Sequence, residues 1–89
     1  MAPGHNAYLH QAMIDVVDNQ IRESDPPETA QTLQRLMGEG HSELETKKLI
    51  AAVVAIEIYG MLKHGEEFDC ARYVDALRKL PDLPLGDAE

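Results

Sequence analysis

Three side chains, on two expected helices, could together hold a metal ion: His10, Glu57 and His64. Glu57 and His64 are two helical turns apart, so their side chains point the same way from one helix. His10 lies on another helix and reaches the same face if the two helices pack antiparallel. Imidazole and carboxylate groups on facing helices are how helical bundles hold zinc or iron. A divalent-metal site is therefore one hypothesis, although neither H-E-x-x-H nor E-x-x-H spacing is present.

Glu57 also has a purely structural interpretation. It is the one charged residue in "LIAAVVAIEIYGML", residues 49–62. A carboxylate removed from water is costly unless it is paired, hydrogen-bonded or bound to metal. Because buried charges are more often paired than metal-bound, a partner from another helix is the preferred explanation. The candidate partners are Arg22, Arg35, Arg72, Tyr8, Tyr59 and Tyr73.

The remaining reactive residue types do not form a catalytic pattern. Cys70 falls in the first turn of an expected helix, where the helix dipole favours a thiolate, but no neighbouring histidine could act as its base. His41 precedes a helix and is expected in a solvated turn, and His5 lies near the chain start. The chain has no G-x-S-x-G, phosphate-binding glycine loop or C-x-x-C motif. The sequence predicts no catalytic residue, and no cofactor other than the alternative metal.

The composition restricts the class of partner. The 89 residues, 44% of them hydrophobic and 27% charged, suit one small globular domain. A formal net charge of −8 repels phosphate backbones and anionic membranes, whereas it suits a basic protein partner. One cysteine, no signal peptide and an apolar stretch shorter than the roughly 20 residues that span a bilayer predict a cytoplasmic protein without nucleic-acid or membrane binding.

The elements that must position these residues are all helical. Apolar residues recur at spacings of three and four, and alternating strand patterns are almost absent. Pro26 suits the first position of a helix capped by Asp25, Ser42 and Asp69 suit two further N-caps, and Gly65 suits a C-terminus. The prediction is an all-α bundle of four helices over about 7–23, 26–37, 43–64 and 70–79, in one domain at 1–80, with an extended proline-containing tail at 81–89.

The third predicted helix, 43–64, indicates a second chain. Beyond Leu49 it is apolar on nearly every side, and three shorter helices must cover it. Apolar surface that stays uncovered favours a two-fold homodimer, unless the other helices wrap this one completely. The predicted interface residues are Val53, Val54, Ile56, Ile58 and Met61. A small apolar ligand beside Gly60 and Met61 is a further hypothesis.

The first half of the chain resembles a known group of sequences. "NAYLH", a glutamine ten residues later and then "SDPP" resemble a family of uncharacterised small bacterial all-helical proteins with an N-P-x-L-H, glutamine, D-x-P pattern. The corresponding positions are Asn6, Leu9, His10, Gln20, Asp25, Pro27, Gly40 and His41. This chain departs from the pattern at Ala7, where the family has proline, and at Ile14, where it has a second histidine. The resemblance implies a helical fold and no established activity.

The function predicted from these features is that of a small helical interaction or accessory module, homodimeric and without catalytic activity. The alternative is a metal-binding helical bundle that uses His10, Glu57 and His64.

Overall fold

Four α-helices make up the part of the protein that the computed structural model describes, residues 3–83, with side chains from residue 11 onward. They are α1 (Pro3–Glu23), α2 (Pro27–Gly38), α3 (Glu43–His64) and α4 (Cys70–Lys79). No strand occurs within 3–83, so the predicted all-α bundle of four helices is confirmed. The side chains of His5, Tyr8 and His10 lie outside the described residues, as do residues 84–89 of the predicted tail.

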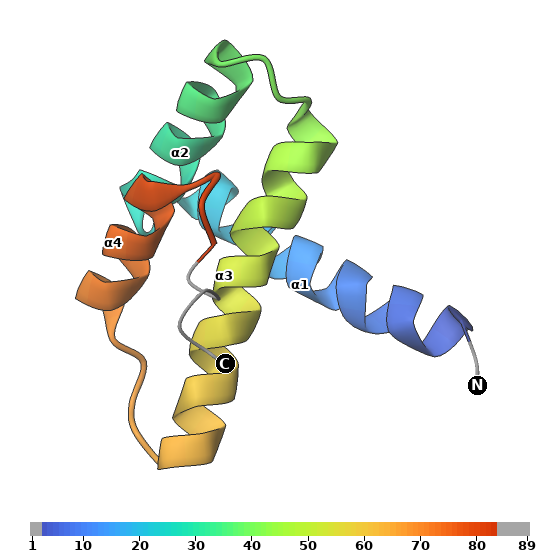
Figure 1. Ribbon diagram of the computed structural model, residues 1–89, viewed down its shortest axis with the longest axis vertical. Helices are drawn as coiled ribbons and strands as arrows, with labels where there is room; N and C mark the ends of the chain where they lie inside the picture. The colour runs from blue at the N-terminus through green and yellow to red at the C-terminus, as the bar shows by residue number, and fades with distance from the viewer. Residues whose placement is uncertain (1–2, 84–89) are drawn as a thin grey trace.

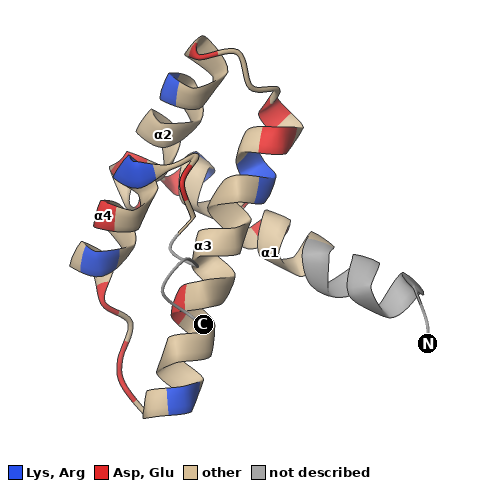
Figure 2. Ribbon diagram, viewed as in Figure 1, with Lys and Arg blue, Asp and Glu red and all other residues tan. Residues whose placement is uncertain are grey.

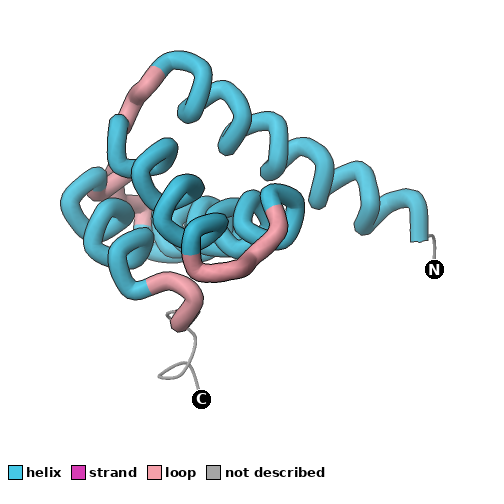
Figure 3. Tube along the Cα trace, turned by 90° about the horizontal axis from the view of Figure 1, so that it is seen from above, coloured by secondary structure: helices cyan, strands magenta, loops and turns pink. Residues whose placement is uncertain are grey.

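The helices pack around α3. In Figure 1, α2 and α4 lie side by side along one flank of α3, and α1 crosses α3 instead of running antiparallel to it. Figure 3, seen from above, shows the first half of α1 leaving the cluster that the other helices form. The metal hypothesis required α1 and α3 to pack antiparallel, and the crossing of the two helices does not meet this requirement. None of the described helices is long and apolar enough to cross a membrane.

Both ends of α3 are set by local sequence signals. The Ser42 hydroxyl accepts a hydrogen bond of 3.0 Å from the backbone N–H of Glu45, which satisfies an amide that the first helical turn leaves free. Gly65 takes left-handed geometry with φ of 65°, and its N–H bonds to the Met61 carbonyl. Glycine adopts this conformation without the steric penalty that a Cβ brings. The predicted bounds of α3 are confirmed.

The start of α4 also follows its predicted signals. The Asp69 carboxylate accepts a bond of 3.1 Å from the backbone N–H of Arg72. The rings of Phe68 and Tyr73 lie 5.4 Å apart between centroids, in the contact that joins the residue before a cap to the fourth helical residue. This contact helps to fix the direction in which the chain enters α4.

The predicted starts of the first two helices differ from the structure. Helix α1 begins at Pro3, four residues before the prediction. Asp25 does not cap α2: Pro26 occupies the cap position without a side-chain bond, and Pro27 takes the first helical position. Either proline satisfies the rule for a first helical residue, so the sequence rule could not choose between them. The start of the tail is not free, because Leu83 packs against the core.

The core receives side chains from every helix. Leu77 of α4 and Leu80, just after that helix, are buried, and Val17 of α1 is completely buried. The fully buried apolar side chains are Val17, Leu36, Ile50, Val53, Tyr73, Leu77 and Leu80, the last of these 2% exposed. Such burial is worth about 1.5–3 kcal/mol for each large apolar side chain, so this cluster is the main stabilising feature of the fold.

Candidate functional site

Glu57 is paired with an arginine from the neighbouring helix. Its side chain is 5% exposed, and the Arg72 Nε donates a hydrogen bond of 3.0 Å to its Oε1. Arg72 is half exposed, so it holds the buried carboxylate from the solvent side. The hydrogen bond to Glu57 raises the pKa of Arg72 further, which keeps the guanidinium charged. The preferred explanation for Glu57 is therefore confirmed, and the partner is Arg72.

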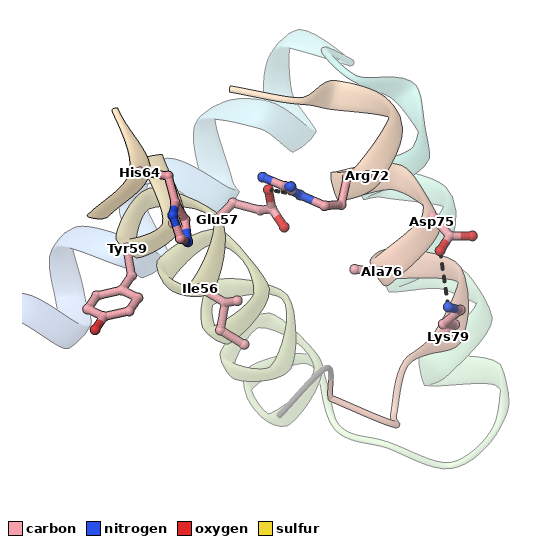
Figure 4. Close-up of a pocket in the computed structure, with 9 residues that line it drawn as sticks. Ile56, Glu57, Tyr59, His64, Arg72, Asp75, Ala76 and Lys79 are labelled. Carbon is pink, nitrogen blue, oxygen red and sulfur yellow. Dashed lines mark hydrogen bonds and ion pairs between the residues drawn. The ribbon is translucent and has the colours of Figure 1, made fainter. Parts of the chain in front are cut away.

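This ion pair spans a groove between α3 and α4 of about 400 Å³. Figure 4 shows Glu57 and Arg72 pointing toward each other from the two helices, with the Asp75–Lys79 pair of 3.2 Å on α4. Ala76 is nearly buried in the groove, and a Cβ added at Gly60 would meet no atom within 4 Å. The groove is lined by Ile56, Glu57, Tyr59, Gly60, His64, Arg72, Asp75, Ala76 and Lys79.

The groove brings together two of the three predicted metal ligands. Glu57 and His64 both line it, and His64 is exposed. The side chain of His10 lies outside the described residues, and among the side chains of 11–83 no three potential ligands gather within reach of one ion. A metal bound by Glu57 would have to compete with the Arg72 guanidinium for the carboxylate. His41 lies elsewhere, with its Nδ1 3.6 Å from Glu45.

An apolar stripe that faces solvent runs along α3 next to the groove, and Tyr59 lines both. Ala52, Ala55, Tyr59 and Leu62 follow one another at spacings of three, four and three residues, which is the heptad spacing of a coiled-coil contact. Tyr59 is 64% exposed, Leu62 is 80% exposed, and Ala55 is exposed as well. Glu57 is the one charged residue from Ala52 to Leu62, and this part of α3 is mostly tan in Figure 2. We call these four residues the outer seam.

The predicted interface residues divide between the two sides of α3. Val53 and Val54 are buried in the core of the same chain, so they are not available to a second copy. Ile56 and Ile58 are half-buried and flank the outer seam, one on each side. Met61 is half-buried on the turn beyond the core. The seam residues Tyr59 and Leu62 were not among the predicted interface residues, although their spacing is visible in the sequence.

A hollow lies at the end of the outer seam nearest the start of α3. It has a volume of about 220 Å³ and is lined by Met13, Lys48, Ala51, Ala52 and Ala55. Four of these residues belong to α3 and Met13 belongs to α1, so the hollow forms where α1 crosses α3. The small alanine side chains leave the space that larger residues would fill.

A buried polar network joins three helices, and its members were not among the predicted site residues. The side-chain oxygen of Gln20 accepts bonds from the Thr29 hydroxyl at 2.8 Å and from the Tyr73 hydroxyl at 2.7 Å. Thr29 and Tyr73 are completely buried. Burial raises the pKa of the Tyr73 hydroxyl. All three groups are neutral and satisfied, so the network fixes helix positions and offers no acid or base for catalysis.

Two further polar features belong to the surface. Lys47 bridges α1 and α3 through Asp18 at 2.7 Å and Glu43 at 3.0 Å, and these bonds raise the pKa of Lys47. Cys70, at the first turn of α4, is exposed. Neither residue stands beside a group that would give it a chemical role.

Compared with protein-family models, with curated protein sequences and with solved structures, the chain has no match. The resemblance to the small bacterial family stays a prediction, and function must be argued from the surface of this molecule.

Proposed function

We propose that the protein is a small helical interaction module that acts by binding another protein chain through the outer seam of α3. The single observation that carries this proposal is the exposure of Tyr59 and Leu62 on an apolar helix face. Three of the five large apolar side chains that are exposed among the described residues, Tyr59, Leu62 and Phe68, come from the second half of α3 or the loop that follows it.

The energetic argument supports binding at this face. Covering a side chain as exposed as Leu62 stabilises a complex by about 1.5–3 kcal/mol, because apolar surface leaves water. Aromatic residues near the centre of an interface are the usual anchors of affinity, and Tyr59 has that place in the seam. The proposed role needs no catalytic group, in line with the sequence prediction of a non-enzymatic module.

The test compares two equally simple changes. A photoreactive amino acid replaces Leu62 in one variant and Met37 in another; Met37 is an exposed apolar residue on α2, away from the seam. Illumination in cells that produce the protein should crosslink the position 62 variant to a discrete protein band, either a second copy or another protein. The Met37 variant should give no such band. Equal crosslinking at both positions, or none at position 62, would contradict the proposal.

Metal binding is the second candidate function, and the observation in its favour is that Glu57 and His64 line one groove. It requires the carboxylate to leave Arg72. Elemental analysis of protein purified without an affinity tag tests it directly. Stoichiometric zinc or iron that disappears in the His64→Ala variant would establish the site, and metal-free protein with no thermal shift on adding zinc would reject it.

A further inference from the structure

We infer that the protein bound by the outer seam is a second copy of this chain, docked so that the two α3 helices run antiparallel about a two-fold axis. The inference rests on the proposed function, because it identifies the partner of the same surface. Three features of the seam select this partner and this direction: the order of its residue sizes, the hollow beside its small end, and the charges at its two ends.

Residue size changes along the seam. Its first two members, Ala52 and Ala55, are small, and its last two, Tyr59 and Leu62, are large. Heptad layers of an antiparallel pair join an a position of one helix to a d position of the other. One register then sets Ala52 against Leu62 of the second copy and Ala55 against Tyr59 of the second copy. Each layer combines a small and a large side chain, which is what close packing needs.

The opposite direction fits poorly. A parallel pair would set Tyr59 against Tyr59 and Leu62 against Leu62, while the layers of Ala52 and Ala55 would leave voids. Unfilled volume in an interface loses dispersion contacts on the lining atoms. The size order therefore favours an antiparallel arrangement.

The hollow beside Ala52 lies where this register needs space. Leu62 of the second copy would arrive opposite Ala52, and the hollow of about 220 Å³ is bounded there by three alanines, Met13 and Lys48. A leucine side chain entering it would touch apolar groups from both α1 and α3. By symmetry, Leu62 of the first copy enters the same hollow of the second, so the interface is closed and uses both hollows.

The charges at the ends of the seam fit the same register. Lys48 lies one turn before Ala52, and the acidic residues Glu66 and Glu67 follow the left-handed glycine that ends α3. The antiparallel register brings Lys48 toward this acidic segment of the second copy, twice by symmetry. A parallel pair would set like charges together at both ends, which opposes association. This charge complementarity comes from residues of one chain, so two copies satisfy it without any other protein.

The first experiment measures association by sedimentation equilibrium for wild-type protein, Leu62→Lys and Met37→Lys. We expect wild type to form dimers at tens of micromolar concentration. Leu62→Lys should weaken dimerisation at least tenfold, because a charge would enter the apolar hollow. Met37→Lys should match wild type. A wild-type monomer at 200 µM would overturn the inference, whereas crosslinking of position 62 to another protein would still uphold the proposed function.

The second experiment tests direction by disulfide trapping in a Cys70→Ser background, with Lys48→Cys and Glu66→Cys made in separate chains. In the antiparallel register positions 48 and 66 of the two copies come near each other, while two copies of either position stay about 27 Å apart along the helix axis. Oxidation of the mixed chains should therefore give a disulfide-linked heterodimer. Each variant oxidised alone should run as a monomer on a denaturing gel without reductant. Crosslinking of either variant with itself, or dimers that never crosslink, would overturn the inference.

Discussion

Glu57 lies in the middle of the most apolar helix, and Arg72 of α4 holds its carboxylate. Removing one partner of a buried pair leaves a charge in a poorly solvated place, and this cost exceeds the net value of the pair itself. The pair also joins α3 to α4 on the side of the groove, so it helps to set the spacing of the two helices. Loss of Arg72 should therefore cost more stability than loss of an arginine on the surface.

Replacing Arg72 by methionine should lower the melting temperature, because the Glu57 carboxylate then lacks a counter-ion. Arg78→Met, on an exposed position of the same helix, is the matched control and should change little. The double variant Glu57→Gln, Arg72→Met should recover part of the loss, since an amide carries no charge to be desolvated. Circular dichroism melts of the four proteins measure this. Equal melting temperatures for the two arginine variants would contradict the prediction.

The Tyr73 hydroxyl gives a second prediction at the scale of one residue. Tyr73→Phe removes one of the two donors to Gln20 and should lower the unfolding free energy by about 1–2 kcal/mol at pH 7. Tyr59→Phe, at an exposed tyrosine, is the control and should stay within about 0.5 kcal/mol of wild type. Urea titrations measure both values. A Tyr73→Phe protein as stable as Tyr59→Phe would show that the network contributes nothing.

The same residue predicts how stability depends on pH. Burial raises the pKa of Tyr73 above its ordinary value of 10.0, so the folded protein holds the phenol proton more tightly than the unfolded chain does. The stabilisation that the protonated Tyr73 gives to the folded state is complete below about pH 10, and it is lost as pH rises through the pKa of Tyr73 in the folded protein. Lys47, whose pKa is raised above 10.5 by its bonds to Asp18 and Glu43, adds a loss of the same sign. Urea titrations from pH 8 to 11.5 should show a smaller alkaline decline in Tyr73→Phe than in Tyr59→Phe.

At the scale of helices, α3 has one glycine within it and another at its C-cap, and the two have opposite roles. Gly60 lies within the helix, and a Cβ there would meet nothing within 4 Å. Gly65 ends the helix in left-handed geometry, which disfavours a residue with a side chain. Gly60→Ala should therefore raise the unfolding free energy by about 0.5–1 kcal/mol, whereas Gly65→Ala should lower it by about 1 kcal/mol. Urea titrations of the two variants check the signs, and any result in which both change the same way contradicts this explanation.

The helices that could be predicted most closely are those with local end signals. Ser42 and Gly65 cap the two ends of α3, and Asp69 caps the start of α4. Each cap acts through contacts with residues close to it in the sequence. The crossing of α1 over α3 could not be predicted, because it depends on which of several apolar stripes pack together. The Gln20 network could not be predicted either, since its three members come from three helices.

The candidate site was predictable in part, and for different reasons at each position. Arg72 was among three possible arginines, and only the position of α4 could choose between them. The outer seam is different, because its spacing of three and four residues is present in the sequence. Apolar neighbours on every side of α3 concealed it: burial of Val53 and Val54 had to be known before Tyr59 and Leu62 could be placed outside.

At the scale of the whole molecule, the fold is slightly less compact than a typical domain, although its extents along the three principal axes, 34, 31 and 28 Å, are similar. The radius of gyration is 13.1 Å, compared with about 12 Å expected for a compact chain of this length. The first half of α1, which leaves the cluster of the other helices, accounts for the difference (Figure 3).

The net charge of −8 predicts the effect of salt on association. Two copies repel each other at long range because both are acidic, and the seam itself is apolar. Salt should therefore strengthen dimerisation by screening this repulsion more than it weakens the attraction between Lys48 and Glu66. Raising NaCl from 20 to 500 mM should strengthen dimerisation by roughly three- to tenfold at pH 7. Sedimentation equilibrium at both salt concentrations measures it. Weaker association in high salt would mean that attraction between charges dominates the contact.

The division of α3 into an inner side that fills the core and an outer side that faces water has an evolutionary consequence. Mutations at Ala52, Ala55, Tyr59 and Leu62 can accumulate with little penalty to folding, because the side chains that hold the bundle together are Ile50, Val53 and Val54. Descendants of this chain could therefore exchange one binding specificity for another while keeping the same scaffold, and a protein engineer could do so by redesigning four positions.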